Sequence, residues 1–141
     1  MDPEKEARMQ ALLTQPVLAR LATTNPKTLQ PHLTIVWFYW DGTSIWISAF
    51  TSTRKVRELM KNPRCAVLLE PKQPDSQLQA VLFEGQAELV TQPRSLVHTM
   101  AEHIYTKYMG PEGVMALEPQ SWMRDPENLL IKLTPQRPIV W

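Results

Sequence analysis

The sequence predicts a mainly β fold with inserted helices, arranged as one small barrel over residues 1–141. About six short segments are rich in apolar and β-branched residues and are bounded by turn residues, as strands are. Asp41-Gly42 separates two of these segments and is a strong hairpin signal. Hairpins come early and helices are inserted among the strands, a pattern that favours a closed or partly closed barrel over a doubly wound sheet. A chain of 141 residues is the size of a single domain.

The strands are expected where apolar or aromatic runs lie between polar turns, at residues 17–24, 33–40, 44–50, 65–70, 79–90 and 129–134. The run 33–40 is almost wholly apolar or aromatic, so we expect it to be covered on both faces. Gly85 lies inside the longest strand and predicts a bulge or a bend there.

Helices are expected at residues 3–14, 53–61 and 93–110. Asp2 suits the N-cap of the first helix. The second helix ends at Asn62-Pro63 and has an apolar side formed by Val56, Leu59 and Met60. The third ends at Gly110-Pro111 and has a buried stripe of Leu96, Val97, Met100, Ile104 and Tyr108. Residues 111–127 are predicted to be irregular.

Composition excludes several classes of function. The net charge of +1 gives no global field that would attract nucleic acid or an acidic membrane, and no run approaches the roughly 18 apolar residues of a membrane span. Cys65 is the only cysteine, so no internal disulfide forms and a cytoplasmic location is expected. Cys65 lies in an apolar strand and is interpreted as a core residue rather than a nucleophile. No cluster has the spacing of metal ligands.

One segment, Thr51-Ser52-Thr53-Arg54-Lys55, predicts an anion site. It joins an apolar strand to a helix, and Ser52 or Thr51 is expected to cap that helix. A helix start favours acidic residues, yet this one begins with two cations, and a bound anion would reverse the penalty. Free backbone N–H groups, hydroxyls and cations therefore meet where phosphates tend to bind. The alternative is a surface turn with two solvated cations.

With these elements placed, the chain resembles the flavin split-barrel family, also called pyridoxamine 5'-phosphate oxidase-like. The resemblance runs over residues 17–141 and depends on the order of the motifs Ala19-Arg20-Leu21-Ala22-Thr23, Pro31-His32-Leu33-Thr34-Ile35-Val36-Trp37-Phe38, Asp41-Gly42, Ile45-Trp46-Ile47-Ser48, Ser52-Thr53-Arg54-Lys55-Val56-Arg57, Asn62-Pro63-Arg64 and Glu84-Gly85-Gln86-Ala87-Glu88. It implies a homodimer of six-stranded split barrels. Flavin mononucleotide (FMN), or a deazaflavin coenzyme in one branch, would lie in a groove between the subunits.

The resemblance also implies which residues bind the cofactor: Ile35, Val36, Trp37, Phe38, Ser48, Ala49, Thr53, Arg54 and Lys55. Ser52 or Thr53 would donate a hydroxyl hydrogen bond to the phosphate. The phosphate site inferred from the residues and the family's phosphate site coincide at Arg54 and Lys55. Backbone groups of residues 35–37 would meet the polar edges of the ring. Trp37 would either stack on the ring or pack in the core or dimer interface, and Trp40 is assigned to packing.

The sequence departs from the family at two positions that matter for function. Phe38 stands where the vitamin B6 oxidases have a substrate-binding lysine, so oxidation of pyridoxamine phosphate itself is not expected. Gln79 lies one residue from the position of a flavin-contacting glutamine, and a shift of one residue turns a strand side chain to the other face.

The resulting hypothesis is an FMN-dependent oxidoreductase that acts on a small planar substrate. The alternatives are a deazaflavin-dependent reductase, a non-catalytic flavin-binding protein, a heme-binding protein and a cofactor-free interaction domain. No catalytic residue is assigned: His32 is either a proton donor or an edge histidine, and His98 and His103 are interpreted as solvated.

Overall fold

The computed structural model describes residues 1–141. The four helices are α1 (Pro3–Leu13), α2 (Arg54–Lys61), α3 (Arg94–Gly113) and α4 (Leu117–Arg124). The eight strands are β1 (Ala19–Thr24), β2 (Pro31–Val36), β3 (Tyr39–Trp40), β4 (Ile45–Phe50), β5 (Arg64–Leu69), β6 (Val81–Val90), β7 (Asn128–Leu133) and β8 (Ile139–Val140). No helix combines the length and the apolar character that crossing a membrane requires.

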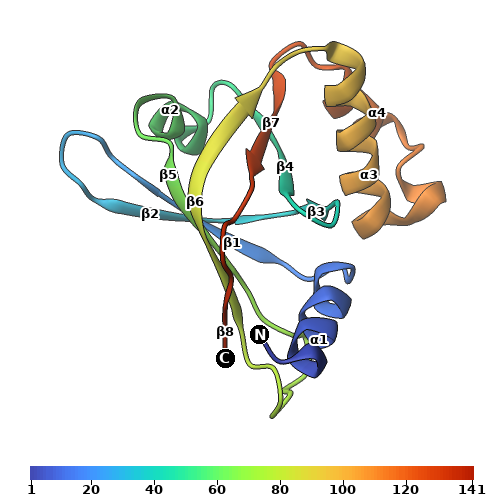
Figure 1. Ribbon diagram of the computed structural model, residues 1–141. Coiled ribbons are helices and arrows are strands. Elements are labelled where there is room, and N and C mark those ends of the chain that lie inside the picture. Colours follow the sequence, from blue (N-terminus) through green and yellow to red (C-terminus); the bar gives the residue numbers. More distant parts are fainter.

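The strands form one antiparallel sheet in the order β2-β1-β5-β6-β7-β4-β3, and β8 pairs with β6. The two end strands, β2 and β3, are consecutive in the chain and are joined by Trp37 and Phe38. The sheet therefore curls back on itself as an open half-barrel, and Figure 1 shows α3 and α4 together on one side of it. The mainly β class is confirmed. The count of six strands is not, because the run 33–40 divides into β2 and β3 and the tail adds β8.

The long strand β6 connects the two halves of the sheet. Its residues 81–86 pair with β5 and its residues 87–90 pair with β7, and the register continues without a bulge. Gly85 lies next to this change of partner, where an added Cβ would come within 3.0 Å of the Leu133 Cδ1 atom. The absence of a side chain at Gly85 thus leaves room for the Leu133 side chain of β7.

Alternating residues of the strands fill two cores. Ile45, Ile47 and Ala49 of β4 point into a cluster of 21 buried residues inside the curl of the sheet. Trp46 points the other way, into a cluster of 9 buried residues beneath α3. The period of two along β4 therefore gives one strand two buried faces.

The prediction that residues 33–40 are covered on both faces is wrong for β2. The side chains of Leu33 and Ile35 are 66% and 64% exposed. They lie two residues apart on the same face of the end strand β2, and their exposure shows that the rest of the chain does not cover that face. A continuous apolar run indicates burial, but it does not distinguish burial within one subunit from burial by another chain.

The predicted helices form, with corrections at their ends. Asp2 caps α1 and accepts a hydrogen bond from the Lys5 backbone N–H. The helix predicted to end at Gly110 breaks there, with φ of +80°, and a further turn follows. Residues 111–127 are not irregular, because they contain α4. Pro119 indicates a helix break in the sequence, but it lies in the first turn of α4, where its missing N–H costs no hydrogen bond.

Candidate functional site

A pocket of about 230 Å³ brings together residues from three of the predicted cofactor-binding segments. Five predicted residues line it: Ile35, Val36, Trp37, Ser48 and Lys55. The sequence interpretation missed the other two, Ile104 and Tyr105 of α3, as site residues. We call this hollow the Lys55 pocket. It lies where the exposed strand β2, strand β4 and the start of α2 meet α3.

Lys55 is the only charged residue that lines this pocket. Its side chain is half-buried, and burial lowers the pKa of the ammonium group from its ordinary value. None of the five ion pairs in the structure includes Lys55. A partly desolvated cation without a counter-ion is a favourable partner for an anionic ligand.

Ser48 is held in place by two neighbours. Its Oγ atom donates to the Asn128 Oδ1 atom at 2.8 Å and lies 2.9 Å from the Tyr105 hydroxyl oxygen. Asn128 is fully buried at the start of β7. Burial raises the pKa of Tyr105 despite the bond with Ser48, so its phenol stays protonated. Because the Ser48 hydroxyl donates to Asn128, the Tyr105 hydroxyl is the donor toward the Ser48 Oγ atom.

Trp37 forms the aromatic side of the pocket. Its ring stacks on Tyr108, with the centroids 4.8 Å apart and the planes 3° from parallel, and meets Tyr105 edge to face at 6.2 Å. One face of the indole is therefore used by packing within the chain. Trp40, as expected, packs: it stacks on Phe83 and donates from Nε1 to Gln10.

Three predicted residues turn their side chains into the barrel. Val36, Phe38 and Ala49 are all buried in the larger core cluster. The Phe38 backbone is also occupied, because its N–H donates to the Tyr108 hydroxyl and its carbonyl oxygen accepts from the Lys107 Nζ atom at 3.2 Å. Phe38 thus has neither a side chain nor a free backbone group to offer a ligand. Val36 and Ala49 can contribute only backbone groups.

The start of α2 differs from the prediction. The N-cap is Thr53 rather than Ser52 or Thr51, and its hydroxyl donates to the Phe50 carbonyl oxygen at 2.8 Å instead of capping the helix. Ser52 is exposed and lines no pocket that includes Lys55. The apolar side of α2 is also corrected, since Met60 is exposed while Glu58 is buried.

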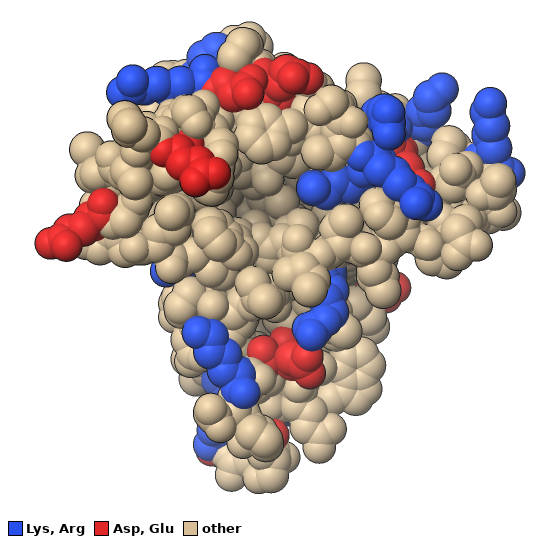
Figure 2. Space-filling view, turned by 180° about the vertical axis from the view of Figure 1, so that it is seen from behind, with Lys and Arg blue, Asp and Glu red and all other residues tan.

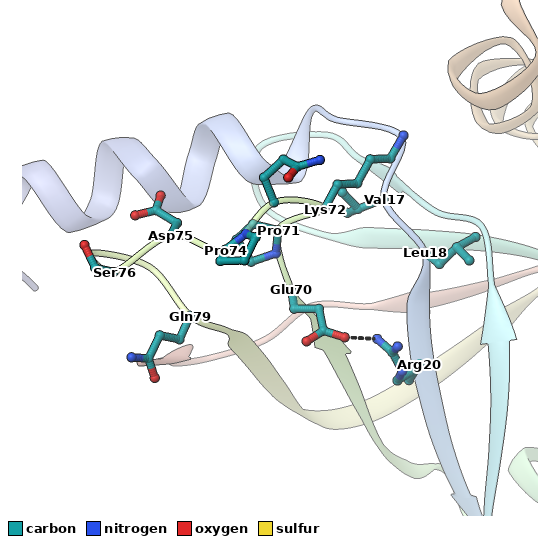
Figure 3. Close-up of a pocket in the computed structure, with 11 residues that line it drawn as sticks. Val17, Leu18, Arg20, Glu70, Pro71, Lys72, Pro74, Asp75, Ser76 and Gln79 are labelled. Atoms are coloured by element: carbon teal, nitrogen blue, oxygen red, sulfur yellow. Dashed lines mark ion pairs between the residues drawn. The ribbon is translucent and has the colours of Figure 1, made fainter.

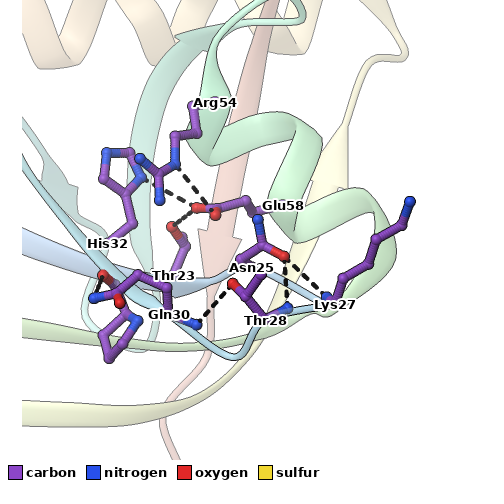
Figure 4. Close-up of polar contacts among 9 residues, drawn as sticks. Thr23, Asn25, Lys27, Thr28, Gln30, His32, Arg54 and Glu58 are labelled. Carbon is purple, nitrogen blue, oxygen red and sulfur yellow. Dashed lines mark hydrogen bonds and ion pairs between the residues drawn. The ribbon is translucent and has the colours of Figure 1, made fainter.

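Arg54 does not join Lys55 in the same pocket. Its Nε atom donates to the Glu58 Oε2 atom at 3.3 Å, and it lines a separate hollow beside the β1–β2 turn. Figure 4 shows Thr23, His32 and Arg54 converging on the Glu58 carboxylate. Burial acts to raise the pKa of Glu58, but the hydrogen bonds from these three side chains together lower it.

Gln79, Cys65 and His103 do not line the Lys55 pocket. Gln79 lines a polar hollow of about 990 Å³ with the ion pair Arg20–Glu70 (Figure 3), and this hollow shares no residue with the Lys55 pocket. Burial raises the pKa of Cys65 to about 11, so its thiol is not a ready nucleophile. Of the histidines interpreted as solvated, His103 is exposed but stacks on Tyr39.

The fold and the Lys55 pocket define a class of protein: a split barrel with a small, cation-bearing pocket on its outer surface. The model of the pyridoxamine 5'-phosphate oxidase family matches residues 6–141, and the chain belongs to this family. No curated protein sequence matches the chain.

Solved structures share the fold across nearly the whole chain. The conserved hypothetical protein Rv2991 from Mycobacterium tuberculosis is 26% identical, with a TM-score of 0.77 over 96% of this chain and 83% of that one. A protein described as an F420 reductase is 24% identical, with a TM-score of 0.71 over 92% and 94% of the two chains. The heme storage protein HutZ from Vibrio cholerae is 15% identical, with a TM-score of 0.74 over 96% and 93%. At these low identities the last two likenesses concern the fold alone.

Proposed function

We propose that this protein is an FMN-dependent oxidoreductase whose cofactor lies in the Lys55 pocket. The observation that carries the proposal is the unpaired, half-buried Lys55 beside Trp37 and Ser48. These same residues are the ones that the resemblance to the family implies for flavin binding. Membership of the pyridoxamine 5'-phosphate oxidase family supports the proposal.

The residues that line the pocket fit the parts of the cofactor. Lys55 supplies a charge-assisted bond to the phosphate. β2 is an end strand, so the backbone groups along one of its sides have no strand partner and are available to the polar edges of a ring. The Tyr105 hydroxyl and Ser48 add fixed polar groups. Bound flavin would supply hydride and electron transfer, while the protein binds and orients both reactants.

We further propose that a second copy of the chain completes the pocket. Its volume of about 230 Å³ falls below the range of about 300–1,000 Å³ that is typical of small-molecule sites. Ile35 lines the pocket and is exposed on β2 beside Leu33. A partner packed on this face would cover both side chains and deepen the pocket around a flat ligand.

Anaerobic spectroscopy tests the function. Protein loaded with FMN is mixed with a reduced nicotinamide or with a reduced deazaflavin, and bleaching of the flavin band is followed with time. Reduction followed by reoxidation with a planar acceptor supports an oxidoreductase. Retention of flavin without reduction by either donor would indicate a flavin carrier. A sharp Soret band in the purified protein, or tight binding of the deazaflavin in place of FMN, would contradict the choice of cofactor.

A further inference from the structure

A further cleft, of about 1010 Å³, lies between the two ends of the chain. One wall comes from the segment 1–10, which includes most of α1, and the opposite wall comes from the tail, residues 134–140. Figure 1 shows both termini at the same end of the molecule, next to α1 and β8. The cleft shares no residue with the Lys55 pocket, and its volume lies at the upper end of the range of about 300–1,000 Å³ that is typical of small-molecule sites. We call it the terminal cleft.

The floor of the terminal cleft is aromatic and is held in one orientation. Trp40 of β3 stacks on Phe83 of β6, with the ring centroids 5.6 Å apart and the planes at 21°. The Trp40 Nε1 atom donates to the Gln10 Oε1 atom at 2.9 Å, and the Gln10 Nε2 atom donates in turn to the Glu6 Oε1 atom at 3.0 Å. The indole N–H is therefore satisfied within the chain, so Trp40 offers the cleft only the apolar surface of its ring.

Apolar side chains on both walls stay exposed above this floor. Met1 is 60% exposed and Ile139 is 42% exposed, and both line the cleft. A cleft of this size, with an apolar floor and a polar rim, is typical of a small-molecule site. The aromatic floor favours a flat ring over an aliphatic chain, because stacked rings gain more than the area that they bury.

The four charged side chains of the rim differ in their partners. Asp2 accepts from the Lys5 backbone N–H as the cap of α1, and Glu6 accepts from Gln10. The cations Lys5 and Arg137, one on each wall, take part in none of the five ion pairs of the structure. In Figure 2 the Lys and Arg side chains gather on the side where α2 and the β1–β2 turn lie, whereas the end that carries α1 and the termini has charges of both signs. The rim therefore attracts an anionic group by direct contact with two unpaired cations, not by an excess of positive charge.

We propose that the terminal cleft binds an aromatic monocarboxylate, that is, a flat apolar ring system with one carboxylate group. The ring lies against Trp40, and the carboxylate accepts from Lys5 on one wall and from Arg137 on the other. Asp2 and Glu6 would repel additional negative charges, so they select against a ligand with several anionic groups. The proposal holds whether or not the Lys55 pocket binds FMN, because the two sites have no residue in common.

Calorimetric titration of the full chain with naphthoate tests the proposal. Naphthylmethanol is the control for the carboxylate and decanoate is the control for the ring, and naphthoate should bind about tenfold more tightly than either. The double variant Lys5→Met/Arg137→Met should weaken naphthoate by about tenfold and naphthylmethanol by no more than about twofold. The matched control Lys61→Met/Arg64→Met removes two exposed cations outside the cleft and should change the affinity for naphthoate by no more than about twofold. Equal losses of naphthoate affinity in the two double variants, or a wild-type affinity for either control compound that equals the affinity for naphthoate, would overturn the proposal.

Nuclear magnetic resonance of the tryptophan indole N–H groups locates the ligand. The signal of Trp40 is identified as the one that disappears in Trp40→Phe, and naphthoate should shift it because the ligand ring lies against the indole. The shift should persist in Lys55→Met and in the presence of saturating FMN, since the Lys55 pocket is a separate site. An unchanged Trp40 signal, or displacement of naphthoate by FMN, would overturn this inference. Absence of FMN binding with naphthoate binding intact would contradict only the proposed function.

Discussion

Replacement of Lys55 with methionine removes the only cation of the Lys55 pocket while keeping most of its side-chain volume. A hydrogen bond to a charged partner contributes about 1.5–3 kcal/mol, which corresponds to a loss of roughly 10-fold to 150-fold in affinity for FMN. Lys55 is half-buried and therefore little screened, so the effect should survive physiological salt. Quenching of FMN fluorescence on titration with protein measures the dissociation constant.

Riboflavin provides the matched control, because it has the same ring and no phosphate. Its affinity should change by no more than about twofold in Lys55→Met, since no charge-assisted bond is lost. Arg54→Met should weaken FMN less than Lys55→Met does, because Arg54 lines a separate hollow and its Nε atom is already bonded to Glu58. Unchanged FMN affinity in Lys55→Met, or an equal loss for FMN and riboflavin, would refute the assignment of the phosphate site.

The affinity of the wild-type protein for FMN should also depend on pH through Lys55. Burial lowers the pKa of free Lys55 below 10.5, and a bound phosphate would raise it again. Only the protonated lysine attracts the phosphate, so affinity is complete below the pKa of the free protein and is lost as the pH rises above it. This loss on the alkaline side should be absent from Lys55→Met. A pH profile that is the same in both proteins would contradict the role of Lys55.

Three further predictions concern stability and assembly. Glu58→Gln should lower the free energy of unfolding by about 1–3 kcal/mol near neutral pH. Because the pKa of Glu58 is lowered in the folded state, the difference in unfolding free energy between variant and wild type should shrink as the pH falls below about 4.5. A difference in urea unfolding that stays constant with pH would contradict this. Burial lowers the pKa of Lys107 to about 8, so the unfolded chain binds the proton more tightly than the folded one, and the free energy of unfolding should rise with pH between 8 and 10.5. The rise should be smaller in Lys107→Met. Equal slopes of unfolding free energy against pH in the two proteins would refute the reasoning. The proposed dimer should become a monomer in Leu33→Glu, measured by light scattering at micromolar concentration. The control Leu117→Glu, at an exposed position at the start of α4, should leave the dimer intact. A monomeric wild-type protein would contradict a pocket shared between two subunits.

Local sequence patterns predicted the elements whose signals are local. The hairpin at Asp41-Gly42 forms, and Asp41 Oδ1 accepts from the backbone N–H groups of Thr43 and Ser44, as a turn aspartate does. The helix end at Asn62 also follows from its neighbour Pro63. Helix α4 was missed because a proline in a short segment reads as a break.

Placement of site residues was predictable only in part. Lys55, Ser48 and Trp37 follow the resemblance to the family, and they meet in one pocket. The direction of Arg54 depends on Glu58, whose partners Thr23 and His32 lie 35 and 26 residues away in the sequence. No local pattern reports such contacts.

Tyr105 is a pocket residue that the sequence did not predict. It follows Ile104, which belongs to the predicted buried stripe of α3, so the helical period of apolar residues could have predicted that Tyr105 is buried. Its contact with Ser48, 57 residues earlier, depends on how α3 packs across β4 and β7. The sequence therefore predicted a buried helix face, but not that this face forms one wall of the pocket.

The central claim is that the Lys55 pocket binds FMN, and an absorbance spectrum tests it most directly. The purified protein is measured before and after incubation with FMN and removal of free flavin by desalting. We expect a flavin spectrum to remain, at a stoichiometry of about one FMN per chain for a pocket present once in each subunit. A protein that stays colourless after this treatment, while the same preparation is folded, would contradict the account.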